Sequence, residues 1–344
     1  MEKKKKIFYL DFIRVISMFL IVTYHFYAHF AGNNITGIKI FSNDRWGIIG
    51  VALFFMISGA SLMYNYGDKI NLKQYAKKRF LGIYPMFWIA YILVYTYIFY
   101  GSKSALGGDL PSYRYIISLF AMDGYLSPYV HTFYLIGEWF LGCIVLIYFL
   151  FPLLRLAINK YPKTLLIVSA ILNYAVLIFY KTPKMPLNEN LIVCTFSFIL
   201  GMYVIKYIKK IKIWHALIAL IAAIALYCIP RNLNVNLIVL TAYLIGYCLF
   251  FALAYIGEKI QNITVQKIFS LIGKYSYAVF LVHHFIIMKM ESTFANRNLR
   301  IVETISLYIA CWVVISICSK VLFMINKGIL SIFKNDSNRS GEKN

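Results

Sequence analysis

The sequence predicts an all-α, polytopic integral membrane protein with about ten transmembrane helices. Of its 344 residues, 61% are hydrophobic and 14% are charged, and the mean hydropathy is +0.70. Soluble domains contain about 45–50% apolar and about 25% charged residues, so this composition indicates a chain embedded in a lipid bilayer. The aromatic share of 18% favours the same conclusion, because Tyr and Trp anchor helix ends at membrane interfaces.

The membrane-spanning segments follow from their length. A hydrocarbon core about 30 Å thick requires about 20 apolar residues in a helix. Apolar runs near this length, separated by polar or basic segments, predict spans near residues 8–29, 46–66, 81–100, 133–154, 164–180, 190–206, 213–229, 234–256, 269–288 and 304–326. Together they predict a single membrane domain over residues 1–330.

The segments around these spans complete the order of elements. The first span follows "MEKKKK" and so resembles a signal peptide, but it is too long, carries charged residues and lacks a small-residue cleavage site. We therefore interpret it as the first membrane helix. The longest outer loop, residues 101–132, contains "YRYIISLFAMDGYL" and is predicted to include a short surface helix. The tail, residues 331–344, is polar, and we expect it to be disordered.

The basic residues predict the orientation in the membrane. With ten spans and the N-terminus inside, the inner segments hold 23 Lys and Arg residues and the outer loops hold 10. Cytoplasmic loops are enriched in Lys and Arg, so we expect a multi-pass protein of the cell (plasma) membrane with both termini in the cytoplasm. The net charge of +22 is explained by this bias. We find no nucleic-acid-binding motif and expect no nucleic acid partner.

The stretch from Tyr9 to Phe26 of the first span carries three ionisable residues, Asp11, Arg14 and His25. Such residues cost about 2.5–3.5 kcal/mol at mid-bilayer and usually face the protein interior. At about 100° per residue, all three fall on one stripe, with His25 about 21 Å beyond Asp11 along the axis. A simpler alternative is a snorkelling Asp–Arg pair with an interfacial His. His29 completes an H-x3-H pair, but no further ligand cluster follows, so we predict no metal site.

Other polar residues suit a polar interior. The second span carries Ser58 and Gly59 among several small residues, which indicates either helix packing or room for a slender ligand. The segment "KKRFLGIYP" brings Lys77, Lys78, Arg79 and Tyr84 to the start of the third span; it is either a topology signal or a phosphate-binding cluster.

Two further spans contain residues that are costly in lipid. Glu138 lies within the predicted fourth span, where a carboxylate needs a partner. His283 and His284 lie within the ninth, where one of them could simply hydrogen-bond to a neighbouring helix.

Five segments, in this order, resemble the membrane-bound acyltransferase 3 family. They are "LDFIRVISMFLIVTYH" (10–25), "GIIGVALFFMISG" (47–59), "RFLGIYP" (79–85), the Leu-x-x-Glu of Leu135 and Glu138 with "YFLFP" (148–152), and "SYAVFLVH" (276–283). The family usually has a second Arg three residues after the position of Arg79, where this chain has Gly82. Spans five to eight carry no motif that we can place.

The resemblance implies an integral membrane O-acyltransferase that moves an acyl group, usually acetyl, from acetyl-CoA to a hydroxyl of a surface carbohydrate such as a capsular or other exopolysaccharide. Acyl-CoA is then the donor substrate, with no bound cofactor. We assign His25, as base or acyl carrier, and Glu138 to catalysis. The residues that we assign to donor binding are Asp11, Arg14, Ser58, Gly59, Lys77, Lys78, Arg79, Tyr84 and His283.

Two functions of other classes are alternatives. A transporter or exporter of a lipid-linked or sugar-linked molecule would use them as a substrate path; inverted repeats with broken helices would favour it, and we detect none in the sequence. A structural partner in a polysaccharide assembly complex would leave the polar stripe of the first span unexplained.

Overall fold

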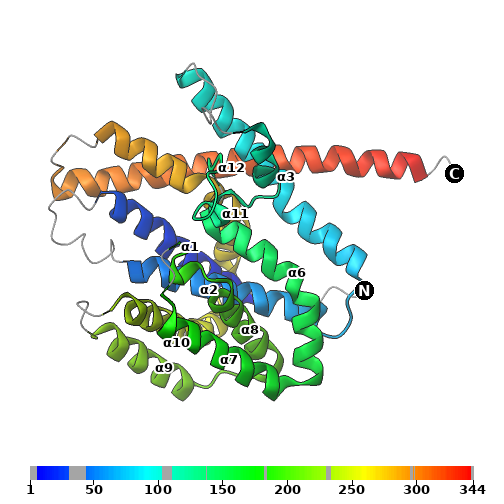
Figure 1. The fold of residues 1–344 in the computed structure, drawn as a ribbon, viewed down its shortest axis with the longest axis vertical. Coiled ribbons are helices and arrows are strands. Elements are labelled where there is room, and N and C mark those ends of the chain that lie inside the picture. Colours follow the sequence, from blue (N-terminus) through cyan, green and yellow to red (C-terminus); the bar gives the residue numbers. More distant parts are fainter. Residues whose placement is uncertain are drawn as a thin grey trace.

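The computed structural model describes residues 6–30, 44–102, 111–136, 138–181, 184–229, 234–294, 297 and 299–341. Every regular element within these residues is helical (Figure 1). In chain order they are α1 (Phe8–His29), α2 (Asp44–Tyr66), α3 (Leu72–Ser102), η1 (Ser112–Arg114), α4 (Tyr115–Leu119), α5 (Asp123–Leu126), α6 (Glu138–Lys160), α7 (Pro162–Phe179), η2 (Leu187–Glu189), α8 (Leu191–Tyr207), α9 (Ile213–Tyr227), α10 (Val235–Lys259), α11 (Ile263–Phe294) and α12 (Ile301–Gly341). The prediction of an all-α membrane protein is confirmed.

A helix occupies the position of each predicted span. Eight of the described helices, α1, α2, α3, α6, α7, α10, α11 and α12, are long and apolar enough to cross a membrane. The other two, α8 with 17 residues and α9 with 15, reach about 25 Å and about 22 Å at 1.5 Å per residue. Both are therefore shorter than a hydrocarbon core of about 30 Å.

Helix α2 lies at the centre of the bundle and packs against α1, α8 and α10. Glycines on α2 and α8 permit the close contact between these two helices. A Cβ at Gly59 would collide with the backbone carbonyl of Phe198 on α8, and a Cβ at Gly201 of α8 would collide with the carbonyl of Met56 on α2. Small residues let helix backbones approach closely in membranes, so this reciprocal pair fixes the α2–α8 contact.

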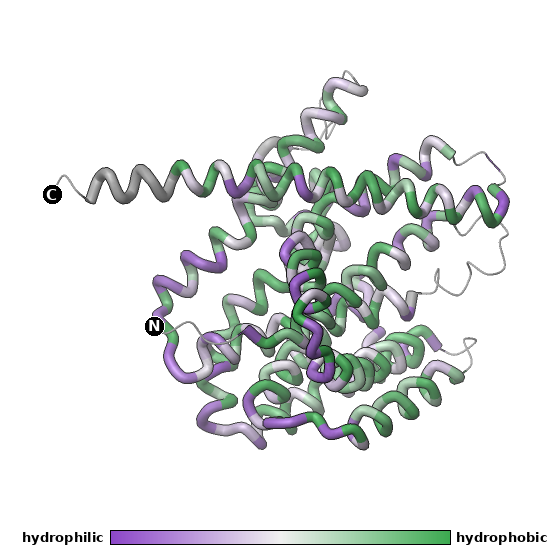
Figure 2. The backbone as a smooth tube through the Cα atoms, turned by 180° about the vertical axis from the view of Figure 1, so that it is seen from behind, coloured by the Kyte–Doolittle hydropathy of each residue, from purple (hydrophilic) through white to green (hydrophobic). Residues whose placement is uncertain are grey.

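The outer helices expose apolar side chains. Exposed Leu, Ile and Val residues cover the outward face of α7, α9 and α12, for example Ile171, Ile221 and Val313. In Figure 2 most of the coloured turns of α9 and α12 are hydrophobic. A surface of this kind is stable in contact with lipid chains, as the composition predicts.

The loop between α3 and α6 folds into short helices, as the sequence predicts. Helix α5 packs on α6, and the α4–α5 turn is fixed by Ala121, which has a φ of 59°. Asp123 is buried at the start of α5, where Ser118 Oγ donates a hydrogen bond of 3.0 Å to its Oδ1.

Two predicted boundaries require correction. The tail from residue 331 is helical as far as Gly341 because α12 continues through it; extending an existing helix costs far less than starting one. Glu138 is the first residue of α6, at the end of the helix and not inside the predicted span 133–154, because residues 131–136 form no regular secondary structure. The side chain of Glu138 lies outside the described residues.

Candidate active site

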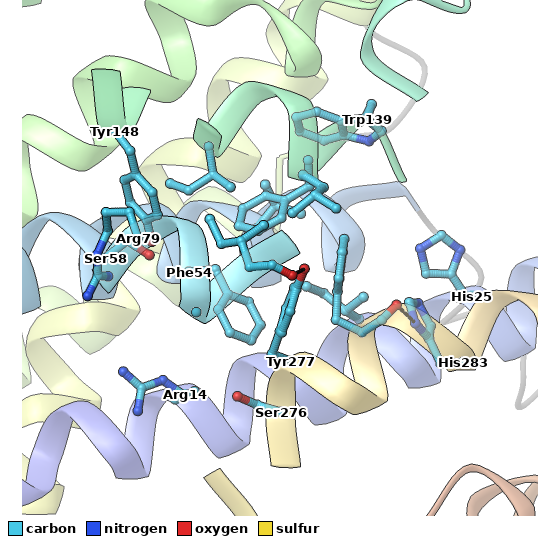
Figure 3. Close-up of a pocket in the computed structure, with 18 residues that line it drawn as sticks. Arg14, His25, Phe54, Ser58, Arg79, Trp139, Tyr148, Ser276, Tyr277 and His283 are labelled. Atoms are coloured by element: carbon cyan, nitrogen blue, oxygen red, sulfur yellow. Dashed lines mark hydrogen bonds between the residues drawn. The ribbon is translucent and has the colours of Figure 1, made fainter. Parts of the chain in front are cut away.

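A cavity of about 250 Å³ lies between α1, α2, α3, α6 and α11. Arg14, Ser58 and Arg79 line one end of it, and His25 and His283 line the other (Figure 3). Aromatic and aliphatic side chains line the stretch between them, including Phe54, Ile83, Phe140, Ile144, Tyr277 and Phe280. The cavity is therefore a mainly apolar passage with two cationic side chains at one end and two imidazoles at the other.

At the cationic end, Asp11 holds Arg14 in place. Asp11 is buried, and its Oδ1 accepts a hydrogen bond of 2.8 Å from Arg14 Nη1. Its Oδ2 accepts another of 2.9 Å from Ser270 Oγ of α11 and lies 2.5 Å from Lys6 Nζ. The predicted Asp–Arg pair is present, and it directs the guanidinium of Arg14 towards the cavity while linking α1 to α11.

The basic segment of α3 contributes Arg79 to the same end. The Arg79 guanidinium lies 5.6 Å from the centre of the Tyr148 ring. Its buried Nε has no hydrogen-bond partner within the described part of the chain. The N–H of Nε is therefore able to donate a hydrogen bond to a ligand. Lys77 and Lys78 are exposed near this end, and Tyr84 donates a hydrogen bond of 3.4 Å to the carbonyl of Phe120.

Small residues take two different roles. Gly82 lines the cavity, and a Cβ there would meet no described atom within 4 Å. Gly50 instead packs against Ile21 of α1, and Gly59 against α8. Ser58 faces the cavity, whereas Gly59, about 100° further round the helix, packs against α8 and does not line this cavity.

At the imidazole end, His25 lies between two histidines of α11. Its ring centre is 5.1 Å from that of His283 and 4.8 Å from that of His284. His283 is fully buried, and its Nδ1 lies 2.8 Å from the carbonyl of Phe280 and 3.2 Å from that of Val279. A carbonyl neighbour places the proton on Nδ1, so Nε2 of His283 carries the lone pair.

A second cavity of about 720 Å³ meets the first at His25. Both are lined by Ile21, His25, Val51 and Trp139. The second cavity extends towards the segments that precede α6 and α8, where Ser127, Tyr134, Lys184, Asn188 and Glu189 line it. His25 therefore stands at the junction between an apolar passage and a wider, more polar chamber.

Asp123 anchors the part of the loop that lines this chamber through Gly124 and Ser127. Burial raises the pKa of its carboxyl to about 6. Between about pH 4 and pH 6 the folded chain binds the proton more tightly than the unfolded chain does, so stability falls as the pH rises through this window.

Asp123→Asn is therefore expected to remove this fall and to stabilise the loop at pH 7.5 by about 1–2 kcal/mol. Melting temperatures of the purified protein at pH 4.5 and pH 7.5 provide the measurement. An identical pH dependence in wild type and variant would contradict the prediction.

Sequence reasoning missed three contributors to this region. Trp139 lines both cavities, and the chamber draws on residues 184–189 between α7 and α8, whose composition is that of an ordinary polar loop. His284 completes a group with His25 and His29; it follows His283 in the chain, but the sequence gives no indication of which helix it faces.

Comparison with known proteins agrees with this architecture. Residues 7–323 match the family model described as an acyltransferase domain. The chain is 24% identical over 268 residues to the acyltransferase MdmB of Streptomyces mycarofaciens, which covers 70% of this chain and 68% of that protein. No solved structure matches the chain. Because the family model spans nearly the whole bundle and both cavities, the chain belongs to the acyltransferase 3 family of membrane acyltransferases.

Proposed function

We propose that the chain transfers an acyl group, most simply acetyl, from cytoplasmic acyl-CoA to a hydroxyl of a cell-surface carbohydrate. The observation that carries this proposal is the position of His25 at the junction of the two cavities. An acyl group that arrives through one cavity and a hydroxyl that arrives through the other would meet at its imidazole.

The apolar passage suits the donor. Acyl-CoA has an anionic nucleotide end and a long, thin pantetheine arm that ends in the thioester. Arg14 and Arg79 offer guanidinium groups for phosphates, which they bind well, and the mainly apolar lining accepts the arm. The exposed Lys77 and Lys78 add positive charge at this end, and the space beside Gly82 leaves room for the nucleotide.

The wider chamber suits a sugar. Carbohydrates are bound through hydrogen bonds to polar side chains and through stacking on aromatic rings. Lys184, Asn188 and Glu189 supply polar groups, and Tyr134 and Trp139 supply rings. An exopolysaccharide hydroxyl in this chamber would lie close to His25.

The chemistry requires one base. Neutral His25 removes the proton from the acceptor hydroxyl as the oxygen attacks the thioester carbonyl. The tetrahedral intermediate then collapses, the carbon–sulfur bond breaks, and the thiolate of CoA takes the proton back from the imidazolium. In a two-step variant, His25 first takes the acyl group itself and then passes it to the hydroxyl.

The orientation follows the distribution of charge. The excess of Lys and Arg on the inner segments supports a cytoplasmic position for Arg79 and the N-terminus in the plasma membrane, on the side where acyl-CoA is made. The chamber then faces outwards, where a surface glycan is available. Both termini are cytoplasmic in this arrangement.

Transfer in reconstituted vesicles tests the proposal against export. Purified protein in liposomes receives radiolabelled acetyl-CoA on the side that bears the N-terminus and glycan on the other. We expect label on the glycan and one free CoA for each acetyl transferred. Movement of an intact sugar-linked molecule without release of CoA would instead support the exporter.

Arg79→Ala is expected to raise the KM for acetyl-CoA about 10-fold or more with little change in kcat, because a buried charge-assisted contact is worth about 1.5–3 kcal/mol. Lys77→Ala is the matched control. Its exposed ammonium is screened by water and salt, so a change of only about twofold is expected. Equal effects of the two substitutions on KM would remove Arg79 from the donor site.

A further inference from the structure

Three histidines gather at one end of the bundle, where α1 and α11 pack together. His25 and His29 stand one turn apart on α1, and His284 faces them from α11. One possible ligand nitrogen from each ring lies within 4.8 Å of the others. Nε2 of His29 lies 3.1 Å from Nε2 of His284.

A carboxylate fixes one of these rings. Nδ1 of His29 lies 2.6 Å from Oε2 of Glu291. Glu291 is on α11, about two helical turns after His284. With its proton on Nδ1, donated to this carboxylate, His29 presents the lone pair of Nε2 to His284. Metal-bound histidines almost always donate their other ring N–H to a carboxylate, a carbonyl or water in this way.

The distances suit a tetrahedral ion after a small adjustment. Zinc binds imidazole nitrogen at about 2.0–2.1 Å, which places two ligand nitrogens about 3.3–3.4 Å apart. The pair formed by His29 and His284 is already near this separation. The ligand nitrogen of His25 lies at most 4.8 Å from those of His29 and His284. Rotation of the His25 side chain can shorten these distances to the separation that zinc requires.

The cluster is accessible to an ion. The side chain of His29 is 23% exposed and that of Glu291 is 36% exposed. Imidazole ligands favour zinc and its neighbours over Mg²⁺ and Ca²⁺, which prefer oxygen.

We propose that His25, His29 and His284 form a zinc-binding site, with Glu291 as the carboxylate that orients His29 and with a fourth position open to water. Zinc in this site takes the lone pair of His25. In a consequence that rests on the proposed function, zinc therefore inhibits acyl transfer, because His25 cannot then act as a base or acyl carrier.

Zinc binding itself is tested without any measurement of transfer. The purified full-length chain, stripped with a chelator, is titrated with zinc chloride in competition with a chromophoric chelator. We expect one tightly bound zinc per wild-type chain, binding at least about 100-fold weaker in His284→Ala and in His29→Gln, and about 10–100-fold weaker in Glu291→Gln. His131→Ala, in the exposed loop before α6, is the control and is expected to bind as wild type does.

The outcomes separate the site from its consequence. Absence of zinc binding by wild type, or unchanged binding in both folded variants, His284→Ala and His29→Gln, overturns the site; thermal melting identifies any variant that fails to fold. If zinc binds and the rate of acyl transfer does not change, the inference that zinc inhibits transfer is wrong. If zinc binds and no transfer occurs under any condition, the proposed function fails and the site stands.

Discussion

His25→Ala is expected to reduce acyl transfer by about 10²–10⁴-fold, the contribution of a positioned general base. The fold should be retained, because the His25 side chain borders two cavities and its removal leaves no overpacked neighbour. The measurement is radiolabelled acetyl transfer to surface glycan in membranes that carry equal amounts of wild-type and variant protein.

His131→Ala, an exposed histidine outside both cavities, provides the comparison and should transfer at the wild-type rate. Wild-type activity in a folded His25→Ala protein would exclude this residue from the mechanism. Label that stays on the wild-type protein in the absence of acceptor, and is lost in His25→Ala, would establish an acyl-histidine intermediate.

Gly59→Ala is expected to have the largest effect on stability. Its new methyl group would strike the Phe198 carbonyl on α8, and a backbone carbonyl cannot move aside as a flexible side chain can. The central helices α2 and α8 must then separate, at a cost near the upper end of the 1–3 kcal/mol typical of overpacking. A fall in melting temperature of about 5–10 °C is expected for the purified protein.

Gly82→Ala is the matched control, since both substitutions replace a helical glycine in the same way. A Cβ at Gly82 meets no described atom within 4 Å, and Ala favours a helix over Gly by about 1 kcal/mol. Its melting temperature should therefore stay level or rise. Equal destabilisation by both substitutions would mean that the α2–α8 contact does not limit stability.

The sequence predicts the helices well because lipid constrains them strongly. Every backbone group in the hydrocarbon core must be hydrogen-bonded, within a helix or between the strands of a closed barrel. An apolar run such as 46–66 is far longer than the about 9–11 residues of a spanning strand, so it favours a helix. The pairing of Asp11 with Arg14 could also be predicted, since a spacing of three residues makes neighbours on any helix. Such local relations do not depend on how the helices pack.

Relations between helices could not be predicted in the same way. His29 and His284 are separated by 255 positions, and their contact depends on the rotation of α11 about its axis, which no local pattern specifies. For the same reason, the sequence could not decide whether the glycines of α2 serve helix packing or make room for a ligand. Packing against α8 accounts for Gly59, whereas its neighbour Ser58 faces the cavity.

Arg14 and His25 both lie on the continuous helix α1, which fixes the distance between the two ends of the passage. Eleven residues of helix hold the two side chains at axial positions about 16 Å apart, and neither can approach the other without breaking the helix. In the proposed function, where Arg14 binds a donor phosphate and His25 lies at the acyl group, a donor has to be long enough to contact both residues at once. Under that proposal, a small molecule that carries its phosphate directly beside the acyl group could contact Arg14 or His25 but not both, so the length of the molecule would select the donor.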